Sequence, residues 1–136
     1  MSWGFIDRVL EKTESHLSAI YTWKEEDCAG HFPGNPVVPG IKLVEMASQT
    51  GALLWSKLSP ETGKTGQFLS IENALFKKMV RPHETVAVKV SWQGEPLNPK
   101  IFSFRAESFF YGGPKDGEAV FSGVISLGKD SFEVNS

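Results

Sequence analysis

The segment from His31 to Gly40, HFPGNPVVPG, limits the possible folds more than any other part of the chain. It contains three prolines and two glycines within ten residues. Proline fixes φ and lacks a backbone donor, and glycine permits positive φ, so the segment is unsuited to a regular helix or a central strand. We therefore predict a stiff loop with a defined shape.

A single long helix is predicted to follow this loop without a break, over Gly40–Leu58. Pro39 lies where the start of a helix tolerates proline. Apolar residues cover most of the helix circumference, which is typical of a buried helix. Glu45 is thus expected in mostly apolar surroundings, where a carboxylate is costly unless it has a partner.

The rest of the chain has the alternation and the β-branched and aromatic content that are typical of strands. A strand is predicted over His16–Trp23, whereas Phe5–Glu14 is consistent with either a strand or a short helix. One long helix followed by consecutive strands predicts an α+β domain in which antiparallel strands wrap around the helix. The segments predicted after the helix are four strands, Gly66–Phe76, Thr85–Trp92, Ile101–Tyr111 and Ala119–Leu127, and a loose tail, Lys129–Ser136.

The length of 136 residues suits one domain over residues 1–136. A net charge of -2 excludes a strong basic field that would attract nucleic acid. No stretch approaches the roughly 18 apolar residues of a membrane span. The N-terminus lacks the basic and then apolar pattern of a signal peptide, so a cytoplasmic protein is expected.

Three motifs, in order along the chain, resemble those of the bacterial 3-hydroxyacyl-[acyl-carrier-protein] dehydratases of the FabZ type. His31–Gln49, HFPGNPVVPGIKLVEMASQ, is similar to the HFPG, PxxPG and EAxAQ-like motifs of that family, with the same interval from His31 to Glu45. Ile71–Pro82, IENALFKKMVRP, is similar to a strand motif of the family, and Phe5–Val9, FIDRV, to its N-terminal strand.

The resemblance implies the hot-dog fold, in which an antiparallel sheet wraps around one long central helix. It also implies dehydration of a (3R)-hydroxyacyl-[acyl-carrier-protein] to the trans-2-enoyl form, in fatty-acid or related lipid or polyketide biosynthesis. His31 and Glu45 are the implied catalytic pair, and the amide of Gly40 is implied to bind the thioester carbonyl. In the family the pair comes from two subunits, so a homodimer is expected, with a trimer of dimers left open.

These residue types suit the implied chemistry. The reaction needs a base for the α-proton and an acid that protonates hydroxide, which is a poor leaving group. Imidazole titrates near neutral pH and suits the base, and a carboxyl group suits the acid when burial keeps it protonated. The N-terminus of a helix offers unpaired amides and a positive dipole end to a carbonyl that gains negative charge.

Several further residues each have two readings. Gln49 lies one helical turn after Glu45 and either supports the site or has a structural role. An apolar group either lines an acyl tunnel or belongs to the core: Phe68, Ile71, Phe76 and Met79. A basic cluster either docks an acidic carrier protein or is a solvated strand end: Lys77, Lys78 and Arg81, with Lys42 as a further candidate.

Acyl carrier protein is the implied partner, and its phosphopantetheine arm would carry the substrate, so no tightly bound cofactor is expected. The three histidines and Cys28 lack metal-ligand spacing, and no metal is expected. A nucleophilic Cys28–His31 pair would lack a third, orienting residue. The other readings are a hot-dog thioesterase, a dehydratase that also isomerises the double bond, whose relatives carry Asp in place of Glu45, and a non-catalytic acyl-binding subunit.

Pro82-His83-Glu84 stands where the family usually has a Pro-Gly-Asp turn, and Cys28-Ala29 stands where bulky residues are common. These departures leave the shape of the pocket and the preferred chain length undetermined.

Overall fold

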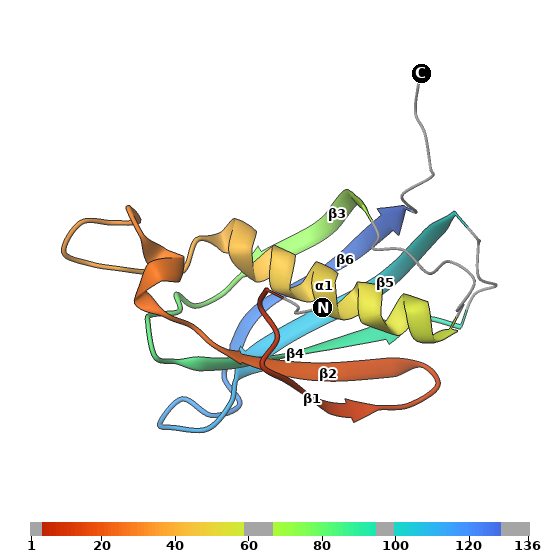
Figure 1. Cartoon of the computed structure of the whole chain (residues 1–136), viewed down its shortest axis with the longest axis horizontal. Helices are drawn as coiled ribbons and strands as arrows, with labels where there is room; N and C mark the ends of the chain where they lie inside the picture. Colours follow the sequence, from red (N-terminus) through yellow and green to blue (C-terminus); the bar gives the residue numbers. More distant parts are fainter. Residues whose placement is uncertain (1–3, 59–66, 95–99, 129–136) are drawn as a thin grey trace, which may run out of the picture.

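The chain forms a sheet and one long helix, as a computed structural model describes for residues 4–58, 67–94 and 100–128 (Figure 1). The helix has the predicted bounds, the predicted strands are present, and the N-terminal segment forms a strand. Gly66 and the predicted tail lie outside the described residues. The elements are β1 (Arg8–Lys12), β2 (His16–Thr22), the 3₁₀ helix η1 (Glu25–Cys28), α1 (Gly40–Leu58), β3 (Gln67–Phe76), β4 (Thr85–Trp92), β5 (Ile101–Phe110) and β6 (Ala119–Gly128).

The strands form one antiparallel sheet with the order β1-β2-β4-β5-β6-β3. Helix α1 lies across one face of this sheet and contacts β2, β4, β5 and β6 (Figure 1). The predicted hot-dog architecture, an antiparallel sheet around one long helix, is confirmed. In the described part of the chain, no helix has the length and apolar character required to cross a membrane.

The core lies between α1 and the inner face of the sheet. Buried and less buried residues alternate along β5, so that one face of this strand points to the helix. Five side chains of α1 are almost completely buried: Met46, Ala47, Thr50, Leu54 and Trp55. The helix is not buried all round, however, because Ile41 and Glu45 are exposed on its other side. The expectation of a fully enclosed helix is therefore wrong for the single chain.

Gly51 allows α1 to approach β5 closely. The ring of Phe104 fills the space that a side chain on residue 51 would need: a Cβ added to Gly51 would lie 2.1 Å from Phe104 Cζ. Phe104 is held in turn by stacking, with 5.5 Å between its ring centroid and that of Phe102. Phe102 stacks on Trp55 of α1 at 5.6 Å, so that packed rings set the distance between helix and sheet.

The two edge strands of the sheet differ in length and polarity. β1 has five residues, RVLEK, of which three are charged, and such an edge discourages pairing with a further strand. β3 has ten residues, QFLSIENALF, of which Glu72 alone is charged. Its large exposed apolar side chains are Phe68, Leu69, Leu75 and Phe76. A long, exposed apolar edge is typical of an interface.

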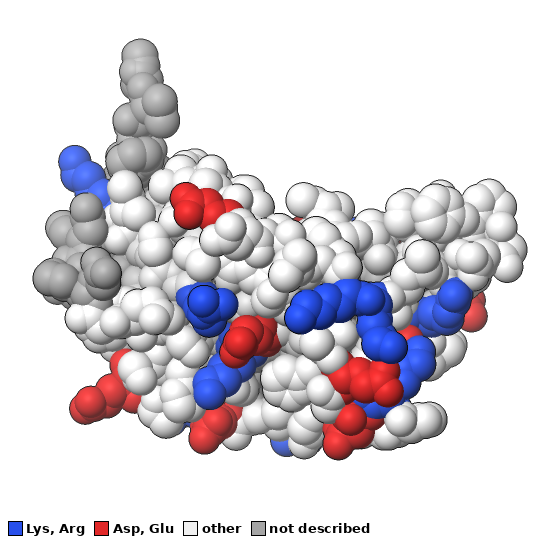
Figure 2. Space-filling view, turned by 180° about the vertical axis from the view of Figure 1, so that it is seen from behind, with Lys and Arg blue, Asp and Glu red and all other residues white. Residues whose placement is uncertain are grey.

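The outer face of the molecule shows the same contrast. Acidic and basic side chains are intermixed over much of this face, whereas the upper rim, where β3 runs, is mostly uncharged (Figure 2). The mixture of signs agrees with the absence of a strong basic field.

We predict that Gly51→Ala destabilises the protein by about 1–3 kcal/mol, as overpacking of a core does. Alanine alone would favour the helix by about 1 kcal/mol, but the added methyl group would clash with the ring of Phe104. Urea denaturation followed by circular dichroism measures the change. Ser56→Ala, on the exposed side of α1, is the control and is expected to stay within about 0.5 kcal/mol. A Gly51→Ala protein at least as stable as the wild type would contradict the close approach.

Candidate active site

The proline-rich segment before α1 folds back on itself as a small turn. The backbones of Phe32 and Asn35 exchange hydrogen bonds of 3.0 and 3.3 Å, and Gly34 has a φ of 73° that suits glycine at this place in the turn. One step outward, the amide of Val37 donates to the carbonyl of His31 at 2.8 Å. The predicted stiff loop is thus closed by backbone bonds within residues 31–37.

The imidazole of His31 lies half-buried beside this turn. Its Nδ1 lies 3.4 Å from the carbonyl oxygen of Val37, and its ring stacks on Phe32 with 4.1 Å between centroids. A carbonyl can only accept a hydrogen bond, so this contact favours the tautomer with the proton on Nδ1. Nε2 then carries the free lone pair, which is the state required of a general base.

His31 and Gly40, two of the predicted site residues, line one groove of about 430 Å³. Phe76 and Met79, predicted for an acyl tunnel, line the same groove, as does Lys77. The other residues along it are Phe32, Val37, Val38, Leu43 and Lys78. The lining is largely apolar, which suits an acyl chain, and one imidazole stands in it.

Gly40 is the first residue of α1, and its amide has no acceptor one turn earlier within the helix. The ring of Phe76 lies over it, since a Cβ added to Gly40 would lie 3.1 Å from Phe76 Cε1. A side chain at this position would crowd that ring and narrow the groove. The structure therefore places a free helix-terminal amide and the imidazole in the same apolar space.

Glu45 does not line this groove in the single chain. It is exposed on the side of α1 that also presents Ile41, whose side chain is 69% exposed. Glu45 was expected in mostly apolar surroundings. Within the single chain this expectation is wrong, because the sheet covers the opposite side of α1. The predicted pair of His31 and Glu45 is not assembled within one subunit's groove.

Gln49 has a structural contact. Its Oε1 accepts a hydrogen bond of 2.8 Å from the amide of Phe5. The ring of Phe5 packs against Tyr21 and Trp23, with centroids 5.5 and 5.0 Å away. Gln49 therefore fastens the N-terminal segment to α1, which favours the structural reading.

Phe68 and Ile71 lie on β3 outside the groove of His31. Ile71 is half-buried against the core and is paired with Ile125 of β6, and Phe68 is exposed on the edge strand. The tunnel prediction is therefore consistent with the groove for Phe76 and Met79, and the groove does not reach the other two.

The predicted basic cluster is divided among different partners. Lys78 forms an ion pair with Glu118 at 3.1 Å, and Arg81 donates a hydrogen bond to Asn35. Lys42 donates to the backbone carbonyl of Asp27 at 2.9 Å and so caps η1. Lys77 is exposed at the groove. These side chains are long and have several possible acceptors, so the sequence does not indicate which partner each one binds.

A polar cluster that the sequence analysis did not identify supports η1, which ends three residues before His31; Tyr21 and Asp27 of this cluster are buried, and Lys24 is exposed. Tyr21 donates to the carboxylate of Asp27 at 2.8 Å, and Lys24 donates to the Tyr21 hydroxyl at 3.1 Å. Burial raises the pKa of Tyr21, which keeps it a donor. The amide of His31 then donates to the carbonyl of Cys28 at 2.9 Å, so this cluster fixes the approach to the site.

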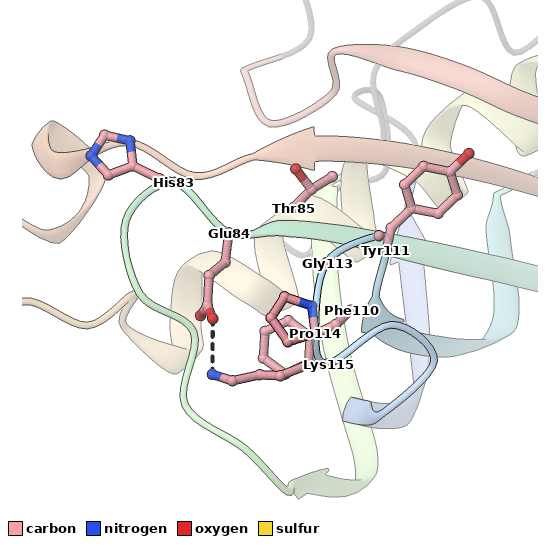
Figure 3. Close-up of a pocket in the computed structure, with 9 residues that line it drawn as sticks. His83, Glu84, Thr85, Phe110, Tyr111, Gly113, Pro114 and Lys115 are labelled. Atoms are coloured by element: carbon pink, nitrogen blue, oxygen red, sulfur yellow. Dashed lines mark hydrogen bonds and ion pairs between the residues drawn. The ribbon is translucent and has the colours of Figure 1, made fainter.

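A second cavity, of about 240 Å³, lies beside the turn after β5 (Figure 3). Its lining includes Glu84 and Lys115, which form an ion pair at 2.8 Å, and none of the predicted site residues. Over residues 4–58, 67–94 and 100–128, no three His, Cys, Asp or Glu side chains gather as metal ligands would.

Solved structures share this fold. The dehydratase heterocomplex ApeI:P from Xenorhabdus doucetiae has a TM-score of 0.72 at 14% identity, over 92% of this chain and 82% of that chain. Cj0977, a sigma28-regulated virulence protein from Campylobacter jejuni, has a TM-score of 0.73 at 8% identity, over 99% of this chain and 92% of that chain. At such identities the likeness concerns the fold alone, which is the hot-dog fold.

Comparisons of sequence identify the family of the chain, beyond its fold. Residues 11–123 match the ApeI-like family, ApeI dehydratase. The 3-hydroxyacyl-[acyl-carrier-protein] dehydratase FabZ of Caulobacter vibrioides (strain NA1000 / CB15N) is 51% identical over 127 residues, which cover 88% of this chain and 77% of that protein. FabZ of Oenococcus oeni (strain ATCC BAA-331 / PSU-1) is 39% identical over 89 residues. That match covers 63% of this chain and 64% of the relative, a little under two thirds of its length. The chain belongs to the ApeI-like dehydratase family.

We predict that Cys28 is chemically inert in the folded protein. Burial raises the pKa of its thiol, and the nearby Asp27 carboxylate adds to that shift, so little thiolate exists near neutral pH. Iodoacetamide at pH 7.5 is expected to label Cys28 slowly in the native state and fully in guanidinium, as mass spectrometry would show. Rapid labelling of the native protein would contradict this prediction and would support Cys28 as a nucleophile paired with His31.

Proposed function

We propose that this protein dehydrates (3R)-hydroxyacyl-[acyl-carrier-protein] to the trans-2-enoyl thioester and water. The observation that supports this most is the placement of His31 and the Gly40 amide along one largely apolar groove, in a chain of a dehydratase family. Relatives named 3-hydroxyacyl-[acyl-carrier-protein] dehydratase FabZ support the choice of substrate and of the carrier protein as partner.

The steps follow from the groups along the groove. Nε2 of His31 takes the α-proton, and the electron pair left behind moves toward the thioester carbonyl, whose oxygen gains charge beside the Gly40 amide. The β-hydroxyl then leaves with a proton from Glu45 as water, and the double bond forms between the α and β carbons. In the hydration direction the same groups reverse their roles.

The proposed active form is a homodimer. Glu45 is exposed and lies outside the groove of His31 in one subunit. Pairing of two β3 edges would cover the apolar residues of this strand and extend the sheet from one subunit into the other. In this arrangement Glu45 of one subunit supplies the acid for His31 of the other. A trimer of such dimers stays an open extension of the proposal.

In this proposal the groove receives the acyl chain, and the carrier protein docks beside it. Phe76 and Met79 offer apolar contact to the acyl chain, and exposed Lys77 is the remaining basic candidate for contact with the acidic carrier. The phosphopantetheine arm arrives with the carrier, so the proposal includes no tightly bound cofactor. A cytoplasmic location belongs to the same proposal.

We predict that His31→Ala and Glu45→Gln each lower turnover on the order of 10²–10⁴-fold, which is the range for losing a general acid or base. Glu45→Gln keeps the size of the side chain and removes the proton donor. Hydration of a crotonyl thioester, followed by loss of the enoyl absorbance, gives the rates. Release of free thiol from the wild type in step with the loss of absorbance would indicate a thioesterase, because hydrolysis also breaks up the conjugated enoyl thioester, and full activity of either variant would refute its assigned role.

We further predict that active sites are shared between subunits. A heterodimer of His31→Ala and Glu45→Gln subunits, purified through two different tags, contains one site with both groups intact and is expected to have about half of the wild-type activity. The reciprocal heterodimer, wild type with the His31→Ala/Glu45→Gln double variant, has one lesion in each site and is expected to be inactive. The opposite pattern would mean that both groups act within one subunit.

A further inference from the structure

The turn that carries His31 has little packing of its own. Residues 32–36 are all exposed, and the bonds that close the turn are internal to it. Stacking of the imidazole on Phe32 does not anchor the turn to the rest of the protein, because Phe32 is itself 50% exposed. The orientation of the turn relative to the sheet must therefore come from contacts with other segments.

Two such contacts come from consecutive residues after β3. The amide of Val38 donates to the carbonyl of Val80 at 2.8 Å, and Val80 is completely buried. Next to it, Nη1 of Arg81 donates to Oδ1 of Asn35 at 2.6 Å. The first contact holds the end of the loop at the core, and the second holds the tip of the turn.

Arg81 is itself held in place from the opposite side. Its amide donates to Oε1 of Glu84 at 2.8 Å, and the amide of Glu84 donates to the carbonyl of Arg81 at 3.2 Å. The other carboxylate oxygen of Glu84 accepts from Lys115 at 2.8 Å, across the cavity shown in Figure 3. A continuous set of bonds thus runs from Lys115 through Glu84 and Arg81 to Asn35.

We propose that Arg81 is a positioning residue for His31, rather than a docking residue for the carrier protein. The inference rests on the proposed dehydratase function. The guanidinium bond to Asn35 fixes the tip of the turn, and the turn fixes the imidazole relative to the Gly40 amide. Misplacement of a reacting group by about 1 Å can cost on the order of 10²-fold in rate, so a surface contact of this kind can matter to turnover.

The test uses two substrates of the same reaction, a crotonyl thioester on the carrier protein and one on N-acetylcysteamine. Arg81→Ala and Asn35→Ala are expected to lower kcat about tenfold on both substrates, with KM little changed on the small one. The double variant is expected to be no worse than either single one, because both remove the same contact. Arg105→Ala removes the same charge from an exposed position on β5 and is expected to retain wild-type rates.

Three outcomes would overturn the inference. One is a rise of KM on the carrier substrate alone in Arg81→Ala, which is the behaviour of a docking residue. Another is a multiplied loss in the double variant, which would mean that the two residues act separately. The third is unchanged kcat on both substrates. Arg81→Lys keeps the charge but not the planar donor, and circular dichroism of every variant separates lost positioning from lost folding.

An inactive wild type would refute the proposed function instead, so the two failures are distinguishable.

Discussion

The contact between Gly51 and the ring of Phe104 fixes how closely the helix lies on the sheet, and the position of the site follows from it. Helix α1 is rigid, and Gly40 precedes Gly51 by 11 residues, or about 16 Å along the axis. Fixing the rigid helix against the sheet at Gly51 therefore also fixes the position of its N-terminal residue, Gly40. The amide of Gly40 and the backbone of Glu45 therefore hold fixed positions relative to the sheet.

The sequence predicted the elements well because the local signals are strong. The proline-rich segment excludes regular structure, the apolar run after it has the length of one helix, and alternation marks the strands. Glu45 was expected in mostly apolar surroundings, but it is exposed in the single chain. Helix apolarity indicates how much surface becomes covered, but not whether the sheet or a second molecule covers it, and Ile41 is apolar yet exposed.

The partners of long polar side chains were the least predictable part of the site. Arg81 and Lys78 are near each other in sequence and form one basic cluster there, for which docking and a solvated strand end were the two readings, yet they bind Asn35 and Glu118. Such choices depend on which loops the fold brings to one end of the sheet, and the residues concerned are 46 and 40 positions apart in the chain. His31 and Gly40, by contrast, were placed together by a short loop that the sequence describes directly.

The unequal edges of the sheet have a consequence for assembly. A sheet with two chemically similar free edges can keep adding strands from further molecules, as fibrils do. Here the β1 edge is short and charged, and the β3 edge is long and apolar. In the proposed dimer, pairing through β3 would cover the apolar edge of both molecules and leave a charged β1 edge at each end of the joint sheet. Addition of further strands at these ends would then be disfavoured, so the proposed pairing would itself limit edge-to-edge aggregation.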